Sequence, residues 1–164
     1  MSDTPASSSS PSAHTVGLRR LFELECEVSA PVSSGTGPGG EIRLIPILGG
    51  RFSGEALSGI VLPGGADWQS VRSDGGLEIS ARYLLQTQHD ERIEVRSDGL
   101  RAATPEVLAR LAKGELLPPD QYYFRTAVRF RTGAPRLAQL NDRLAVAYGQ
   151  RMLRGVRLEV YEVL

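Results

Sequence analysis

Residues 49–68 have the sequence GGRFSGEALSGIVLPGGADW, which contains six of the chain's 18 glycines and its only tryptophan. Because glycine has no Cβ, glycines this dense between apolar residues predict strands that bend sharply or lie against other backbone. Asp67 is a residue type that caps helices, so a short helical turn is expected over residues 67–71. We therefore expect this stretch to help close a barrel and to bring Asp67 and Trp68 to the barrel mouth.

The surrounding chain is predicted to be mostly β-strand. Residues 21–28 alternate strictly between apolar and acidic side chains, which is typical of a strand with one wet face. The sequence also predicts a loop at 30–40 and a turn at 97–99, both built from Gly, Ser, Pro or Asp. Further strands are expected at residues 42–48, 52–62 (one bent strand or two short ones), 77–87, 92–96, 121–132, 144–148 and 156–163.

One helix is expected, at residues 104–113. Thr104 is a suitable N-cap, Pro105 fits the first helical position, and Gly114 ends the pattern. The helix has one apolar stripe, so we expect it to cover one end of a sheet as a lid or plug.

These elements predict a mainly β fold, an antiparallel up-and-down β-barrel of about eight strands with one short inserted helix. Short Gly-rich turns without alternating helices argue against a parallel α/β sheet. A barrel of this size either fills its interior with side chains or holds one small ligand. Residues 1–16 are expected to be a disordered Ser/Pro-rich tail and residues 17–164 a single barrel domain.

The composition argues against several classes of partner. The 164 residues carry 19 basic and 19 acidic side chains, and the arginines are scattered, so no nucleic acid or membrane partner is expected. No apolar run approaches the roughly 20 residues of a membrane span. The amino terminus lacks the pattern of a signal peptide, so a cytoplasmic protein is expected.

The sequence also predicts no metal site and no cofactor. Cys26 is the only cysteine, which excludes an intrachain disulfide, and its apolar neighbours indicate a core residue. The only histidines, His14 and His89, cannot supply a conventional zinc site with one cysteine. The chain has no phosphate loop, dinucleotide-binding motif or nucleophile elbow, which favours simple binding or acid–base chemistry.

Polar side chains inside the predicted strands supply the candidate site residues. Arg82 is either an ordinary exterior arginine or a cation inside the barrel that grips a carboxylate or enolate. Tyr123 and Arg125 suit an acid and an anion clamp if their strand face turns inward. Asp67 and Trp68 are either a helix cap and a core aromatic, or an acid and an aromatic wall at the mouth.

On the functional interpretation, four of these residues are catalytic and three contact the substrate. The catalytic candidates are Asp67, Arg82, Tyr123 and Arg125. The substrate-binding candidates are Trp68, Tyr83 and Asn141. Asn141 ends a predicted short helical piece at residues 137–141, so a C-terminal cap is its alternative role.

Several short motifs occur in a fixed order along the chain. They are Gly64-Gly65-Ala66-Asp67-Trp68, Asp74-Gly75, Ala81-Arg82-Tyr83, residues 122–126 (YYFRT), Phe130-x-Thr132-Gly133, Leu140-Asn141 and residues 160–163 (VYEV). With these motifs the chain, from Leu18 onward, resembles the bacterial and fungal family of domain of unknown function 3237. The resemblance implies a small antiparallel β-barrel and brings no settled general activity.

The chain departs from the pattern of that family in several places. The family tends to have Asp-x-Arg where Ser80-x-Arg82 stands here, Phe-Glu-Thr where Arg131 stands, and Trp-Leu-Asn where Gln139 stands. The usual Asp-Gly hairpin tip is His89-Asp90 in this chain. If the family has an active centre at these positions, this chain has altered it, which indicates a specialised pocket or lost chemistry.

The leading functional hypothesis is a cofactor-independent isomerase, lyase or cyclase that acts on a small molecule in the barrel. Its substrate would carry a carboxylate or an enolisable carbonyl, with Arg82 or Arg125 stabilising the anion and Asp67 or Tyr123 moving a proton. The second hypothesis is a non-catalytic barrel that carries or senses a small ligand. The third is a homodimer or higher oligomer without a pocket, in which the arginine face forms intersubunit ion pairs.

Overall fold

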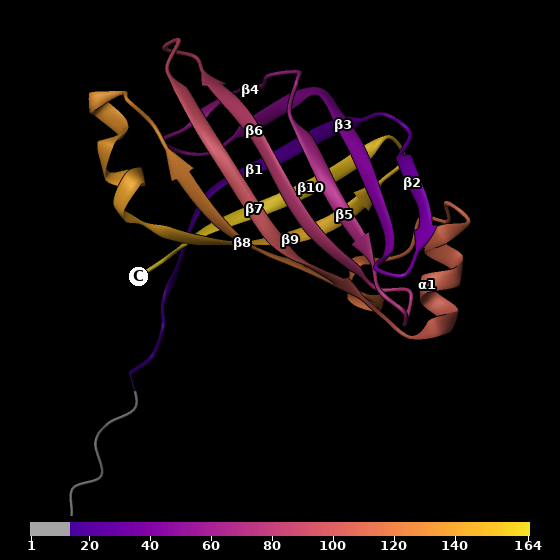
Figure 1. The fold of residues 1–164 in the computed structure, drawn as a ribbon. Coiled ribbons are helices and arrows are strands. Elements are labelled where there is room, and N and C mark those ends of the chain that lie inside the picture. The colour runs from indigo at the N-terminus through magenta and orange to yellow at the C-terminus, as the bar shows by residue number, and fades with distance from the viewer. Residues whose placement is uncertain (1–13) are drawn as a thin grey trace, which may run out of the picture.

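The computed structural model describes residues 14–164, and the greater part of the predicted tail, residues 1–13, lies outside the described residues. The described residues form ten strands, one α-helix and two short 3-10 helices (Figure 1). The strands are β1 (Leu18–Val28), β2 (Val32–Gly37), β3 (Gly40–Ser53), β4 (Ser58–Val61), β5 (Ala66–Val71), β6 (Leu77–Thr87), β7 (Arg92–Ala102), β8 (Tyr123–Arg131), β9 (Leu144–Met152) and β10 (Gly155–Val163). The helices are α1 (Pro105–Ala112), η1 (Pro119–Gln121) and η2 (Pro135–Asp142).

Eight of the strands close into an antiparallel barrel. Their order is β1-β10-β9-β8-β7-β6-β4-β3, and β3 pairs with β1 to complete the circle. β5 also lies between β3 and β6 and pairs with both, while β2 forms a hairpin with β3. Barrel neighbours follow one another along the chain, so the predicted up-and-down barrel with one short inserted helix is confirmed.

Glycines let the strands of the 49–68 stretch approach their neighbours closely. A Cβ on Gly50 would lie 2.1 Å from the carbonyl oxygen of Glu25 in β1. A Cβ on Gly59 would lie 2.0 Å from the carbonyl oxygen of Gln86 in β6. A larger residue at either position would force the strands apart, so the predicted close approach of backbone is confirmed.

Residues 67–71 lie in strand β5, so the predicted helical turn is wrong. Asp67 faces Ile45 of β3 on one side and Ala81 of β6 on the other. Sheet neighbours on both sides use the backbone N–H and C=O groups of this segment, which one turn of helix would leave largely unpaired. Asp67 therefore projects from a strand, with Trp68 on the opposite face.

The predicted turn at residues 97–99 is also wrong, because these residues lie inside β7. Gly99 pairs with Ile79 of β6 and Thr126 of β8, and a Cβ there would lie 2.0 Å from the carbonyl oxygen of Arg125. The glycine serves a close contact between strands rather than a turn. β9 likewise continues past residue 148, and part of the predicted loop at residues 30–40 forms β2.

Helix α1 lies across one end of the barrel, and η2 lies at the opposite end (Figure 1). The Thr104 hydroxyl accepts a hydrogen bond from the backbone N–H of Val107, and Pro105 occupies the first turn, which confirms the predicted start. Leu111 is buried on the inner face of α1. Within residues 14–164, every helix is too short or too polar to cross a membrane.

The barrel interior is packed with side chains towards the η2 end and hollow at the α1 end. Phe22 packs edge-on against Phe52 and Phe130, with ring centroids 5.4 and 6.1 Å away. Leu85 and Ile93 are fully buried beside them. These five side chains do not line the cavity at the α1 end, so the fold separates a packed half from a hollow one.

Candidate functional site

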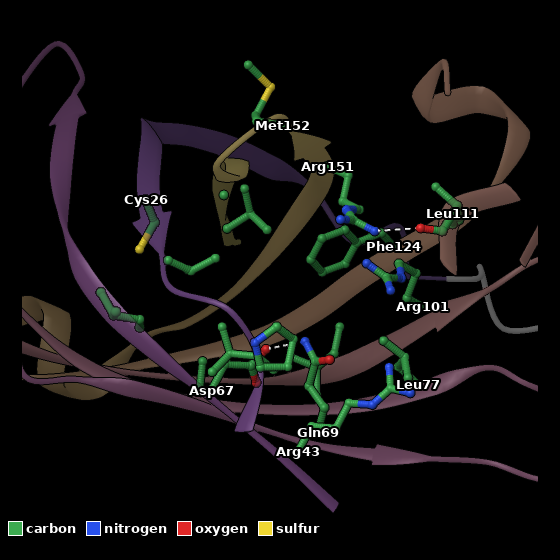
Figure 2. A pocket seen from close by; sticks show the side chains of 18 of the residues that line it. Cys26, Arg43, Asp67, Gln69, Leu77, Arg101, Leu111, Phe124, Arg151 and Met152 are labelled. Atoms are coloured by element: carbon green, nitrogen blue, oxygen red, sulfur yellow. Dashed lines mark hydrogen bonds between the residues drawn. The ribbon is translucent and has the colours of Figure 1, made fainter. Parts of the chain in front are cut away.

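A cavity of about 880 Å³ occupies the hollow end of the barrel, beneath α1 (Figure 2). Its walls are mostly apolar and come from inward-facing positions of several strands. Leu108 and Leu111 of α1 cover it. The apolar wall residues include Leu24, Ile47, Ile79, Phe124 and Leu158.

Polar side chains reach the cavity because three strands place them on their inward faces. In β5 the inward residues are Asp67 and Gln69, since Trp68 between them points outward. In β7 the inward alternation runs from Ser97 to Arg101, and in β9 it ends at Arg151. Figure 2 shows Arg101 and Arg151 beside Phe124, with Asp67 and Gln69 on another wall.

Asp67 is a carboxyl group held in place inside the cavity. Its Oδ2 accepts a hydrogen bond of 2.6 Å from Nε2 of Gln69, and its Oδ1 accepts one of 3.2 Å from the backbone N–H of Ser80. Burial raises the pKa of Asp67 above its usual value, although these hydrogen bonds and the charge of Arg101 oppose the shift. The protonated carboxyl therefore persists to higher pH than on a protein surface.

Arg101 is a cation without a partner among the residues that the structure describes. Its Nε is buried and has no hydrogen-bond partner, and Arg101 forms no ion pair within residues 14–164. Burial, with the nearby charge of Arg151 second, lowers the pKa of Arg101 to about 10. The guanidinium still carries its charge at neutral pH. The other buried unpartnered Nε, on Arg157, belongs to a guanidinium that is already paired with Glu23.

Three further arginines line the cavity; Arg154 is exposed, and Arg151 and Arg43 differ in how they are paired. Nη1 of Arg151 donates to the carbonyl oxygen of Leu111, 2.8 Å away at the end of α1. Arg43 forms a two-pronged ion pair with Glu41 at 2.8 and 3.0 Å, and Arg43 is the main reason that the pKa of Glu41 falls to about 2. Arg43 is thus neutralised, whereas Arg101 and Arg151 leave positive charge in the cavity.

Cys26 and Tyr83 also line the cavity. Burial raises the pKa of the Cys26 thiol to about 12, so the thiol stays protonated at neutral pH. Cys26 is buried, as the alternation of residues 21–28 predicts. Burial likewise raises the pKa of Tyr83 above its usual value, so its phenol is a neutral hydrogen-bonding group. No three His, Cys, Asp or Glu side chains in residues 14–164 are grouped so that they could hold a metal ion.

Comparison with known proteins places this barrel in a family. Residues 16–163 match the model of a family described as "Protein of unknown function (DUF3237)". The chain belongs to the DUF3237 family. This confirms the resemblance seen in its motifs.

This DUF3237 protein is similar in sequence or fold to several known proteins. A UPF0311 protein of Rhodopseudomonas palustris is 36% identical over 150 residues, which cover 92% of this chain and 98% of that protein. A crystal structure of a conserved protein of unknown function from Rhodopseudomonas palustris superposes with a TM-score of 0.88 at 35% identity, covering 93% of this chain and 100% of that one. An enzyme from Penicillium herquei has a TM-score of 0.73 at 19% identity, covering 94% and 99%, which shows a shared fold alone.

Of the seven residues predicted for the site of this DUF3237 protein, the structure brings Asp67 and Tyr83 together at the cavity. Asp67 comes from β5 and Tyr83 from the inward face of β6. Arg82, next to Tyr83, points outward and pairs with Glu94 at 2.8 Å. Its prediction as a cation of the barrel interior is therefore wrong, because inward and outward positions alternate along the strand.

Tyr123 and Arg125 also lie on the outer surface, so the inward orientation that their catalytic roles require is not found. Tyr123 is 54% exposed. The Arg125 guanidinium stacks over the Tyr148 ring at 3.5 Å and near the Tyr123 ring at 5.2 Å. The inward residues of β8 are their neighbours Phe124 and Thr126, which line the cavity.

Trp68 and Asn141 do not reach the cavity either. Trp68 is 56% exposed on the outer face of β5, so it is neither an aromatic wall nor a core residue. Asn141 exchanges two hydrogen bonds with the backbone of Thr132, at 2.9 and 3.0 Å, which is a structural role. The positions where the chain departs from the family pattern are exposed as well and lie outside the cavity: Ser80, His89, Asp90, Arg131 and Gln139.

Sequence reasoning missed four of the polar side chains that line the cavity: Arg43, Gln69, Arg101 and Arg151. Two of them lie beyond the predicted ends of their strands. Continuing the alternation from Ser97 through Gly99 would have placed Arg101 inward, and continuing it from Ala147 through Gly149 would have placed Arg151 there. The alternation of inward and outward residues thus indicates the positions of both arginines. A glycine within such an alternation is, however, also typical of the end of a strand.

Proposed function

We propose that this DUF3237 protein binds a small organic molecule in the barrel cavity and catalyses a cofactor-independent proton transfer on it, as an isomerase, lyase or cyclase does. The observation that carries this proposal is Asp67, a carboxyl group inside the cavity whose pKa is raised by burial. Such a group stays protonated to higher pH than a surface carboxyl and is suited to act as a general acid.

The surroundings of Asp67 support a role in keto–enol chemistry. Gln69 and the Ser80 N–H fix the carboxyl, and Arg101 supplies positive charge in the same cavity. In an enol-to-ketone step, the enol hydroxyl loses its proton to solvent, and the positive charge nearby stabilises the enolate that forms. Protonated Asp67 then gives its proton to the enolate carbon and regains one from solvent, so that overall one proton moves from oxygen to carbon.

The ketonisation of phenylpyruvate enol tests this function, because the compound carries a carboxylate beside an enolisable carbonyl. We expect the wild-type protein to accelerate the loss of enol absorbance above the buffer rate. Asp67→Asn keeps the shape but cannot transfer the proton, so it should lose about 10²–10⁴-fold of that acceleration.

Glu78→Gln is the matched control, because Glu78 is an exposed acid on the outer face of β6 and does not line the cavity. It should retain the wild-type rate. A wild-type rate equal to that of buffer, or an undiminished rate in Asp67→Asn, would contradict the proposed function.

The alternative is a non-catalytic barrel that carries or senses a small ligand. The apolar walls of the cavity favour it, because side chains such as Leu24, Ile47 and Leu158 suit the body of an organic molecule without any reaction. Native mass spectrometry that detects a copurifying molecule, together with no acceleration of ketonisation, would favour this alternative. The oligomeric module without a pocket is the least supported, because the barrel is hollow at one end.

A further inference from the structure

We propose that Arg101 and Arg151 form a carboxylate-binding subsite inside the barrel, so that the ligand is a small organic acid with an apolar body. This inference rests on the proposed function for the existence of a ligand in the cavity, and it adds the chemical class of that ligand and the residues that select it.

The first support is the unpartnered guanidinium of Arg101. A buried charge without a counter-charge is unfavourable in a folded protein, and arginines inside proteins are normally paired. The Nε of Arg101 has no partner and no carboxylate lies within ion-pair distance in residues 14–164. A ligand carboxylate would supply both the charge and the acceptors that residues 14–164 do not supply.

The second support is the position of Arg151. Arg101 pairs in register with Phe124, and the Phe124 ring lies over Gly149, where a Cβ would be 2.5 Å from it. Arg151 follows two residues after Gly149 on the same inward face, so both guanidiniums lie beside one aromatic ring (Figure 2). Because Arg151 uses Nη1 to bond Leu111, its other donors remain for a ligand.

The third support is the charge balance of the cavity. Asp67 is engaged with Gln69 and the Ser80 N–H, and Arg43 is neutralised by Glu41. The other charged residues of the lining, Glu27, Asp74 and Arg154, are exposed, and Asp74 pairs with Arg72. Among the less exposed residues, two cations thus face one carboxyl that favours its neutral form. A planar carboxylate fits the fork of a guanidinium, so an organic acid would balance this excess positive charge better than a neutral compound would.

The volume and walls of the cavity indicate the rest of the ligand. About 880 Å³ lies within the usual range of small-molecule pockets. With the carboxylate at Arg101 and Arg151, an aromatic or alicyclic body would lie against Phe124, Ile47 and Leu158. Such an orientation leaves the body within the same cavity as Asp67.

A matched pair of probes tests the subsite: 2-naphthoate and its neutral analogue 2-naphthamide, with affinities measured by isothermal titration calorimetry. We expect the wild-type protein to bind the acid at least about tenfold more tightly than the amide, because charge-assisted hydrogen bonds are lost with the amide. Arg101→Gln and Arg151→Gln should each reduce that preference, and the double variant should bind both probes equally. Their affinity for the amide should stay within about threefold of wild type.

Arg82→Gln is the control, because it removes an arginine that points outward from the neighbouring strand β6. It should keep the full preference for the acid, and circular dichroism should show that each variant is folded. If Arg101→Gln fails to fold, Arg151→Gln alone decides the outcome. Equal wild-type affinity for the two probes, binding of neither, or a preference that survives both substitutions would overturn the subsite.

Asp67→Asn separates this inference from the proposed function. Preference for the acid in a protein that does not accelerate ketonisation would support the subsite and contradict the proton transfer. Acceleration that depends on Asp67 without any preference for the acid would overturn the subsite and leave the proton transfer supported.

Discussion

At the scale of single residues, two side chains of the cavity lower the stability of the folded protein. Arg101 holds a charge for which the described part of the chain supplies no partner, and Asp67 holds a carboxyl group in a place that disfavours its ionised form. Both features are typical of functional sites, where groups are positioned for a ligand rather than for the fold. Two consequences can be measured without knowing the ligand.

Replacing Arg101 by Met should stabilise the ligand-free protein. The substitution removes an uncompensated buried charge and keeps a long apolar side chain, so a gain of about 1 kcal/mol or more in the free energy of unfolding is expected. For a chain of this size that gain corresponds to a rise of about 2–4 °C in Tm. Thermal unfolding followed by circular dichroism measures it, with Arg82→Met as the outer-face comparison, and a lower Tm for Arg101→Met would contradict it.

The raised pKa of Asp67 predicts a pH-dependent difference between wild type and Asp67→Asn. The folded state binds the proton more tightly than the unfolded state, so this contribution is complete below the usual aspartate pKa of ~3.9 and declines as pH rises through the raised pKa. Tm of the wild type should therefore fall relative to Asp67→Asn as pH rises from 4 to 8. Parallel Tm profiles of the two proteins would show that Asp67 is not perturbed.

At the scale of elements, the sequence correctly predicted the features that depend only on neighbouring residues. The cap at Thr104 with Pro105 predicted the start of α1 correctly, because a cap involves only adjacent residues. Asp67 does not act as a cap because it lies in β5, and the strands that pair with β5 lie far away in the sequence. The same holds for Gly99, whose role depends on the backbone of β8. The way the barrel closes likewise decides which face of β6 or β8 turns inward. Alternation along the strand alone could therefore not place Arg82 and Arg125.

Gly99→Ala should be strongly destabilising. Its Cβ would lie 2.0 Å from the carbonyl oxygen of Arg125, so β7 and β8 would have to separate, at a cost of about 2–4 kcal/mol. Urea unfolding measures the change. Gly133→Ala is the comparison, since nothing lies within 4 Å of the position that its Cβ would occupy, and it should be neutral or slightly stabilising. Similar unfolding curves for both variants would contradict this role of Gly99.

At the scale of the whole molecule, the barrel combines a packed half with a hollow half. The packed half, centred on Phe22, Phe52 and Phe130, can hold the strands in register without help from the cavity. The cavity end is then free to carry polar groups that would weaken a solid core. This division predicts that a substitution in the cavity can change the binding of a small molecule without lowering the stability of the barrel.

Ala81→Leu should block the cavity without unfolding the barrel. Ala81 faces inward between Asp67 and Ser97, so a larger side chain enters the empty space, and filling a cavity is commonly stabilising by about 0.5–2 kcal/mol. Binding of 2-naphthoate should weaken at least about tenfold while Tm is retained. Ala127→Leu, on the exposed face of β8, should change neither quantity. Undiminished binding in Ala81→Leu would show that the probe lies elsewhere.

The pairing of β1 with both β10 and β3 has a consequence for how the protein is made. A ribosome synthesises β1 first and β10 last, so β1 can pair with β3 early but keeps an open edge until β10 arrives. The ring of strands, and with it the walls contributed by Val156 and Leu158, cannot form on a nascent chain that lacks β10. The closed cavity is therefore a property of the completed barrel, and truncation before Gly155 should leave an open sheet that exposes its apolar face to aggregation.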